Sequence, residues 1–217
     1  MKKNLTEVVF ILDRSGSMSG LESDTIGGFN SMIKKQKEEK GYANVTTILF
    51  DDEIEMLHKS VDIREVKNIT SKDYYVRGCT ALLDAIGYGI NYMINVQKSK
   101  DKDKKADNVL FIITTDGYEN SSKEYSYEKI KSMITKQKEK YNWQFLFIGA
   151  NIDAISTAKS FGISEKFASN YVSDEEGTKI TYEAMNSAIS KCRNNEAMDE
   201  NWKYKIEKDY NIRKKYK

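Results

Sequence analysis

Side chains of the types that bind hard cations stand in three separate segments of the sequence. After the apolar run "VVFIL" (residues 8–12), a carboxylate is followed by serines at alternate positions, with no histidine or cysteine among them. A threonine and a second aspartate follow in two later segments. The candidate ligands are Asp13, Ser15, Ser17, Thr80 and Asp116. Cations such as Mg²⁺ take oxygen ligands, so these residue types suit a metal site if the fold brings the segments together.

Three apolar runs predict strands that are buried on both faces. They are "VVFIL" (8–12), "VLFII" (109–113) and "FLFI" (145–148). Runs without polar alternation are typical of a parallel sheet covered by helices. Apolar residues at helical spacing lie between the runs, as with Leu82, Ile86 and Ile90. The sequence therefore predicts an α/β fold with a doubly wound (Rossmann-like), mostly parallel sheet and helices on both faces.

The segment 44–63 predicts a hairpin. Residues 45–50 read as a strand, Asp51-Asp52 as a turn, and the residues that follow as a half-exposed partner strand. This pairing places one antiparallel strand at an edge of the sheet. Farther along the chain, residues 161–172 predict a last short strand, and we expect a long helix over about 174–195.

The loops that carry the candidate ligands are expected to meet. In an open α/β sheet, ligands bind beyond the carboxyl ends of the strands, near the point where the strand order reverses. The loops after 8–12 and 109–113 leave such strand ends, and Gly78-Cys79-Thr80 directly precedes a predicted helix. We therefore predict a site for a divalent cation, Mg²⁺ first, with Mn²⁺ and Ca²⁺ as alternatives.

These segments resemble the metal-ion-dependent adhesion site (MIDAS) of von Willebrand factor A (VWA) domains. The resemblance rests on Asp-x-Ser-x-Ser at 13–17, on the threonine of "RGCTALLDAI" (77–86) and on the aspartate of "IITTDGYENSS" (112–122). The segment 147–163 is more similar to the stand-alone bacterial and phage versions than to adhesion receptors. One departure is Cys79, where the family commonly has a second glycine, and it bears on the path of that loop.

The resemblance implies how the ligands act. Ser15, Ser17 and Thr80 would bind the ion directly or by turns, while Asp13 and Asp116 would act largely through water. An ion held by neutral hydroxyls keeps much of its positive charge, so its open position would attract an external anion. The resemblance implies that this anion is an Asp or Glu side chain of a protein partner. The expected function is a metal-dependent protein-interaction module of the adhesion type.

Each candidate ligand also has an ordinary structural interpretation. Serines favour helix N-caps and turns, Thr80 suits an N-cap of a helix that begins at Ala81, and Asp116-Gly117 suits a turn. A metal-assisted hydrolase, such as a phosphoesterase, is the alternative function. A serine hydrolase would need Gly-x-Ser-x-Gly with a histidine in reach, whereas the single histidine, His58, is expected on the surface of the edge hairpin. We therefore expect no enzyme.

Charge and length suggest how the chain is divided. We expect a VWA-like domain over 1–197 and a basic C-terminal tail or helix extension over 198–217. Residues 203–217 hold seven Lys/Arg and two Asp/Glu, although the net charge of the chain is only +2. Such a tail is more often solvated than bound to nucleic acid, and no DNA-binding element is visible, so we do not expect nucleic acid as a partner.

The sequence offers no segment that suits a membrane or an export signal. No apolar run approaches the roughly 18 residues of a membrane span, and the run after Lys2-Lys3 is too short for a signal peptide. Cys79 and Cys192 match no zinc or redox spacing and are predicted to be free thiols. These features lead us to expect a cytoplasmic protein, and the resemblance implies one of the bacterial or phage type.

Overall fold

A six-stranded sheet forms the centre of the protein, and the computed structural model describes residues 4–214. The strand order is β3-β2-β1-β4-β5-β6. The strands are β1 (Leu5–Asp13), β2 (Tyr42–Phe50), β3 (Ile54–Asp62), β4 (Asn108–Thr115), β5 (Gln144–Gly149) and β6 (Ala168–Asn170). Neighbouring strands pair in parallel, except that β2 and β3 are antiparallel. The predicted doubly wound sheet with one antiparallel edge strand is confirmed.

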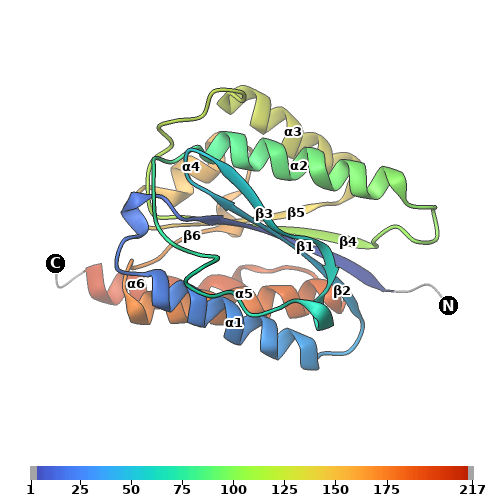
Figure 1. The fold of residues 1–217 in the computed structure, drawn as a ribbon, viewed down its shortest axis with the longest axis horizontal. Coiled ribbons are helices and arrows are strands. Elements are labelled where there is room, and N and C mark those ends of the chain that lie inside the picture. The colour runs from blue at the N-terminus through green and yellow to red at the C-terminus, as the bar shows by residue number, and fades with distance from the viewer. Residues whose placement is uncertain (1–3, 215–217) are drawn as a thin grey trace.

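Helices cover both faces of this sheet (Figure 1). One face carries α2 (Leu82–Ser99), α3 (Tyr127–Tyr141) and α4 (Ala154–Ser160). The other face carries α1 (Glu22–Glu38), α5 (Glu175–Arg193) and α6 (Tyr204–Lys214). The long helix expected over about 174–195 is α5.

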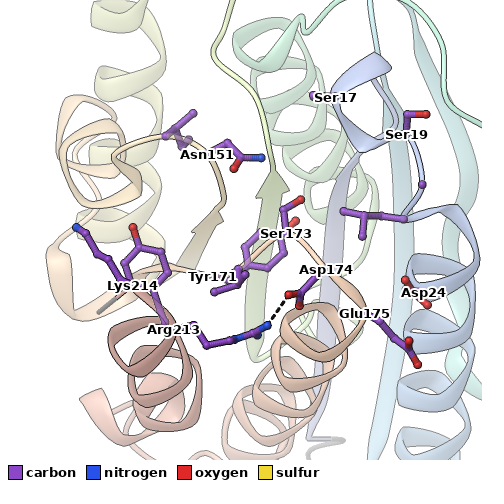
Figure 2. Close-up of a pocket in the computed structure, with 15 residues that line it drawn as sticks. Ser17, Ser19, Asp24, Asn151, Tyr171, Ser173, Asp174, Glu175, Arg213 and Lys214 are labelled. Atoms are coloured by element: carbon purple, nitrogen blue, oxygen red, sulfur yellow. Dashed lines mark hydrogen bonds and ion pairs between the residues drawn. The ribbon is translucent and has the colours of Figure 1, made fainter. Parts of the chain in front are cut away.

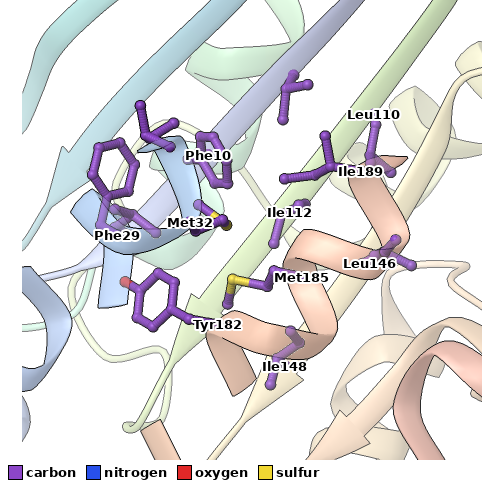
Figure 3. Packing of buried hydrophobic residues seen from close by; sticks show 14 of the residues in the cluster. Phe10, Phe29, Met32, Leu110, Ile112, Leu146, Ile148, Tyr182, Met185 and Ile189 are labelled. Atoms are coloured by element: carbon purple, nitrogen blue, oxygen red, sulfur yellow. The ribbon is translucent and has the colours of Figure 1, made fainter. Parts of the chain in front are cut away.

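The alternation of side chains along β1 divides the core into two layers. Val8, Phe10 and Leu12 belong to the cluster that includes α1 and α5, whereas Val9 and Ile11 belong to the cluster of α2 and α3. All five are at most 1% exposed. A strand covered on both faces must be apolar at every position, which explains the unbroken run in the sequence. Figure 3 shows the first cluster, where Phe10 lies among residues of α1 and α5.

The strand order reverses between β1 and β4. From β1 the chain moves outward to β2 and β3, and after α2 it returns to β4 and moves outward on the other side to β5 and β6. The carboxyl ends of β1 and β4 are therefore the switch point, where open α/β sheets bind their ligands. Asp13 is the last residue of β1, and Asp116 directly follows β4.

The C-terminal segment is packed against the body of the protein. Trp202 and Ile206 are 3% and 1% exposed and belong to the same core cluster as α1 and α5. The indole Nε1 of Trp202 also donates a hydrogen bond to the carbonyl of Lys166 at 2.9 Å. The expectation of a solvated tail is therefore wrong at Trp202 and Ile206, which pack on the core, whereas Tyr204 and Ile212 of the same segment are exposed. The division of the chain at residue 197 stays a prediction.

His58 lies half-buried beneath α1, so the expectation of a surface histidine is wrong. Its ring stacks on Phe29 with 6.3 Å between ring centroids, and its Nδ1 lies 3.0 Å from Thr47 Oγ1. Burial lowers the pKa of His58 below its usual 6.5. The histidine thus has a packing role within the sheet and helix layers.

The two cysteines are free, as expected, with Cys79 exposed and Cys192 buried. Burial raises the pKa of the Cys192 thiol to about 12. Among the helices of residues 4–214, none has both the length and the apolar character that crossing a bilayer requires.

Candidate metal site

Asp13 is fixed in place at the end of β1 by hydrogen bonds to both of its carboxylate oxygens. Oδ1 accepts from the backbone N–H of Ser15 at 2.7 Å, and Oδ2 accepts from the hydroxyl of Thr115 at 2.6 Å. The residue is 1% exposed. Burial raises the pKa of Asp13 to about 6, although the bonds from Ser15 and Thr115 oppose this shift and the charge of Asp116 adds to it. Thr115, which the sequence analysis did not single out, is thus part of the site.

The hydroxyls of Ser15 and Ser17 face each other in the first loop (Asp13–Ser17). Their Oγ atoms are 3.1 Å apart. Ser15 occupies the N-cap position of the 3₁₀ turn Gly16–Met18, but its side chain accepts no capping hydrogen bond. Ser15 therefore stands at the N-cap position without capping the turn through its side chain. Its hydroxyl can serve as a metal ligand.

Thr80 in the second loop (Gly78–Thr80) does not cap the helix that follows. Helix α2 begins at Leu82, so Ala81 occupies the N-cap position, and the N-cap interpretation of Thr80 is wrong. The backbone of Thr80 is held by Asn120, whose Oδ1 accepts the Thr80 N–H at 2.9 Å and whose N–H donates to the Thr80 carbonyl at 3.1 Å. These bonds fix the threonine while leaving its hydroxyl free of a capping role.

Asp116 in the third loop (Asp116–Gly117) has one oxygen without a partner. The residue is 2% exposed; Oδ2 accepts from the Ser173 hydroxyl at 3.3 Å, whereas Oδ1 is buried and has no hydrogen-bond partner among the described residues. Burial raises the pKa of Asp116, and the hydroxyls of Ser17 and Ser173 partly oppose this. Buried carboxylate oxygens are normally paired, so an orphaned one needs a positive or donating group.

Gly117 shows how closely the three loops approach one another. A methyl group at this glycine would lie 3.0 Å from Ser17 Oγ and 3.4 Å from Thr80 Oγ1. Hydroxyls of the first and second loops therefore converge directly in front of the third. The structure thus brings together all five residues predicted from the sequence, while their role as metal ligands stays a prediction.

This donor set fits a hard cation. It consists of hydroxyls and carboxylates, the oxygen ligands that Mg²⁺ prefers, and it includes the unpartnered Asp116 Oδ1. No group of three or more His, Cys, Asp or Glu side chains within residues 4–214 is arranged to hold a metal ion. A site here would therefore depend on neutral hydroxyls as well as carboxylates, as the sequence analysis expected.

A network of buried charges behind the site was not foreseen. Arg14 is fully buried, and its guanidinium bonds Asp51 at 2.8 Å and Glu55 at 2.6 Å. Asp51, also fully buried, accepts a second bond from Arg77 at 2.8 Å. The sequence analysis treated Asp51 as part of a hairpin turn. Nothing in the sequence spacing shows that this turn folds back against the ligand loops.

The departure from the family pattern at Cys79 does not disturb the second loop. Gly78 has a φ of +64°, a conformation that glycine adopts at little cost, whereas Cys79 is not among the residues with positive φ. The carbonyl of Gly78 accepts the N–H of Gly16 at 3.2 Å, which joins the second loop to the first. The conformation therefore requires a glycine at position 78 and accommodates a side chain at position 79, which is exposed.

Glu119 holds the start of α2. Its carboxylate accepts the backbone N–H groups of Leu83, Ser121 and Ser122 at 2.8–2.9 Å. It therefore satisfies donors of the first helical turn and of the third loop's continuation. Its neighbour Tyr118 is 67% exposed beside the site, so it is available to a partner.

A broad groove of about 970 Å³ opens beside the site (Figure 2). It runs from Ser17 past Tyr171 and Ser173 to the end of α6. At its far side, Arg213 of α6 forms an ion pair with Asp174, the N-cap of α5. The site is therefore open toward a surface large enough to receive a segment of another molecule.

Solved structures with the same architecture come from the VWA group. A VWA structure from Catenulispora acidiphila has a TM-score of 0.57 at 12% identity and covers 85% of this chain. The chain has the VWA fold. The manganese-loaded TRAP protein of Plasmodium vivax has a TM-score of 0.59 at 21% identity, covering 83% of this chain and 73% of its own. Proximal thread matrix protein 1 from the mussel byssus, with a zinc-occupied MIDAS motif, has a TM-score of 0.60 at 15% identity and covers 87% of this chain.

These similarities concern the fold. The chain spans 46% of the mussel protein and 42% of the Catenulispora protein. Neither a protein-family model nor a curated protein matches the chain. What the solved proteins bind therefore enters only as support for a proposal.

Proposed function

We propose that the chain is a metal-ion-dependent protein-interaction module whose MIDAS is formed by Asp13, Ser15, Ser17, Thr80 and Asp116. The observation that carries this proposal is the convergence of the Ser17 and Thr80 hydroxyls in front of Gly117, next to the unpartnered oxygen of Asp116. Mg²⁺ is the proposed ion, with Mn²⁺ and Ca²⁺ as alternatives.

The hydroxyl residues and the aspartates would have different roles, because only the aspartates carry charge. The hydroxyls of Ser15, Ser17 and Thr80 would hold the ion without neutralising it, and Asp13 and Asp116 would support it through water. A bound divalent cation would supply a positive centre that attracts an anion. The carboxylate of a partner's Asp or Glu would then complete the site, while Tyr118 and the groove would contact the rest of the partner.

The solved neighbours support a metal at this position. The TRAP structure is manganese-loaded, and the mussel protein carries zinc in its MIDAS motif. Both share the fold on which the five residues of this chain are arranged. The choice of ion, the stand-alone bacterial or phage type and the cytoplasmic location stay predictions.

We propose binding rather than catalysis. The single histidine, His58, packs against Phe29 and forms a hydrogen bond with Thr47, so its ring is held beneath α1. A hydrolase with a serine nucleophile would instead need a base such as histidine beside the serines. Assays with generic phosphoesters in Mg²⁺ or Mn²⁺ test the alternative, and turnover that depends on the metal and disappears in Asp13→Ala would establish the hydrolase.

Metal binding is tested by calorimetric titration of the chain with Mn²⁺ and Mg²⁺. Thr80→Val removes a proposed ligand at constant shape and should weaken binding about tenfold or more, the scale on which even supporting residues of metal sites act. Ser19→Ala is the matched control, because Ser19 is an exposed serine of the same segment outside the proposed set. Equal affinities for wild type, Thr80→Val and Ser19→Ala would overturn the proposed ligands.

The interaction is tested by capture of partners from the native cell with and without EDTA. A partner retained by wild type should be lost with EDTA or Thr80→Val. Undiminished capture after complete removal of divalent ions would refute a metal-dependent interaction.

A further inference from the structure

A second cavity lies at the end of the sheet opposite the candidate metal site, near the amino ends of β4 and β5. It has a volume of about 310 Å³ and lies between the end of α2, the loop before β4 and the end of α3. Helix α2 begins beside the second loop at Leu82 and ends at Ser99, so its length separates the two places. Figure 1 shows α2 and α3 side by side on the same face of the sheet. A ligand of this cavity cannot therefore be a ligand of the metal site.

The lining of this cavity combines apolar surface with positive charge. Its apolar residues are Ile94, Ala106, Tyr141 and Trp143. Its charged residues are Lys98, Lys105 and Lys136, and no Asp or Glu is among the described residues that line it. Small-molecule sites are commonly apolar, with a few polar groups that fix orientation. Here the positive charges of the three lysines favour an anionic ligand.

The three lysines of the lining form no ion pairs with acidic side chains of the described residues. Within residues 4–214, none of Lys98, Lys105 and Lys136 takes part in an ion pair, whereas Lys100 and Lys104 of the same region pair with carboxylates at 2.8 Å. The lysine-rich segment 97–108 therefore contains two kinds of lysine. Lys98 and Lys105, which have no ion pair within residues 4–214, line the cavity, whereas the paired Lys100 and Lys104 do not.

A buried amide oxygen in the lining has no partner. Gln137 is 3% exposed, and its Oε1 accepts no hydrogen bond from any described residue. The other lining glutamine differs, because Gln97 Oε1 accepts the N–H of Ala106 at 3.1 Å. This oxygen has almost no accessible surface, so Gln137 contributes to the wall of the cavity but not to the choice of ligand.

Trp143 and Tyr141 provide a surface for a flat ring. Trp143 stacks on Phe111 with 5.7 Å between ring centroids, and this contact fixes its indole. Tyr141 is 50% exposed, so part of its ring is open to a ligand. We propose that this cavity binds a small aromatic anion: the ring lies against Trp143 and Tyr141, and the lysines receive the negative group.

The two tryptophans of the chain provide a direct readout in ¹⁵N–¹H correlation spectra of the intact protein. Trp143 lines the cavity, whereas Trp202 belongs to the core cluster on the other face of the sheet and donates its Nε1–H to Lys166. Titration with 6-hydroxy-2-naphthoate should shift the indole signal of Trp143 and leave that of Trp202 unchanged. Equal shifts of both signals, or of neither at millimolar concentrations, would overturn the proposal.

The contribution of the negative group is tested with a related probe. 2-Naphthol lacks the charge and should bind about tenfold more weakly, since three lysines no longer act on it. Equal affinity for 2-naphthol and 6-hydroxy-2-naphthoate would show a merely apolar crevice and overturn the anion site.

A charge reversal on α3 gives a matched pair of variants. Lys136→Glu should weaken binding of the anionic probe about threefold to tenfold, the effect of reversing one exposed charge beside a ligand. Lys129→Glu makes the same change on the same helix outside the cavity and should have little effect. Equal affinities of the two variants would contradict the role of the lysine rim. Thermal melting of both variants confirms that they are folded.

Discussion

Asp51 Oδ2 lies 2.8 Å from Arg14 Nε, and both side chains are fully buried. Arg14 belongs to the first loop, whereas Asp51 opens the turn between β2 and β3. The same oxygen accepts from Arg77, and the Asp51 carbonyl accepts the N–H of Ala81 at 2.8 Å. One residue of the edge hairpin therefore ties the first loop to the second and positions both.

Asp51→Asn should destabilise the protein and weaken metal binding together. The substitution leaves the buried Arg14 without its one fully buried counter-charge, since Glu55 is half-exposed, and breaking such a buried pair costs about 3 kcal/mol in the free energy of unfolding. Metal affinity should fall several-fold, because the second loop loses part of its anchor. Urea denaturation and metal titration measure the two effects. Glu53→Gln is the control, since its ion pair with Arg77 is exposed and should contribute less than about 1 kcal/mol. An Asp51→Asn protein as stable as wild type would contradict the anchoring role.

Gly78→Ala and Gly27→Ala should have opposite effects on stability. Gly78 has a φ of +64°, and an added methyl would collide with the side chain of Asp52. The alanine should therefore cost about 1–2 kcal/mol. Gly27 lies in α1 with nothing within 4 Å of an added methyl, so alanine should stabilise by about 0.5–1 kcal/mol. Urea denaturation compares the variants, and a Gly78→Ala protein of wild-type stability would show that the second loop has another conformation.

Trp202→Ala should destabilise the whole domain rather than loosen a tail. The indole is 3% exposed within the core cluster, and truncation of such a side chain costs about 3–5 kcal/mol. Tyr204→Ala is the matched control: this neighbour is 62% exposed and its loss should change stability by about 0.5 kcal/mol or less. If both variants unfold at the same urea concentration as wild type, the C-terminal segment does not pack on the core in solution.

The single histidine offers a direct pH measurement. Burial lowers the pKa of His58, so the folded state favours the neutral ring. As the pH falls below 6.5, the unfolded chain binds the proton first, and the stability contributed by the neutral ring is progressively lost. Proton NMR of the His58 Cε1–H in an untagged chain should give a midpoint below 6.5. His58→Gln should unfold with a shallower loss of stability between pH 6.5 and 5, and a midpoint at or above 6.5 would contradict the burial.

The sheet and the five candidate ligands could be predicted from sequence because their signals are local. Apolar runs mark strands covered on both faces, as for Val8 to Leu12, and their ends mark the loops that meet at the switch point. The hairpin turn at Asp51-Asp52 was equally visible. These patterns depend on the order of residue types along the chain, which the sequence gives directly.

The supporting contacts could not be predicted because they join residues far apart in sequence. Arg14 and Asp51 pair across 37 positions, and Thr115 reaches Asp13 across 102. The packing of Trp202 was not predicted for a related reason. The excess of charge in the segment led to the expectation of a solvated tail, although Trp202 and Ile206 fit the core. His58 likewise looked exposed because one strand pattern does not show which helix covers it.

Asp13 already has both oxygens engaged by the chain itself, through the Ser15 N–H and the Thr115 hydroxyl. Its orientation is therefore acquired when the polypeptide folds, and no later event has to supply it. A metal site built this way would lose little conformational entropy on binding, so its affinity would not be reduced by the cost of ordering its own side chains. Stripped of divalent ions, the molecule should keep its shape and remain ready to be loaded again.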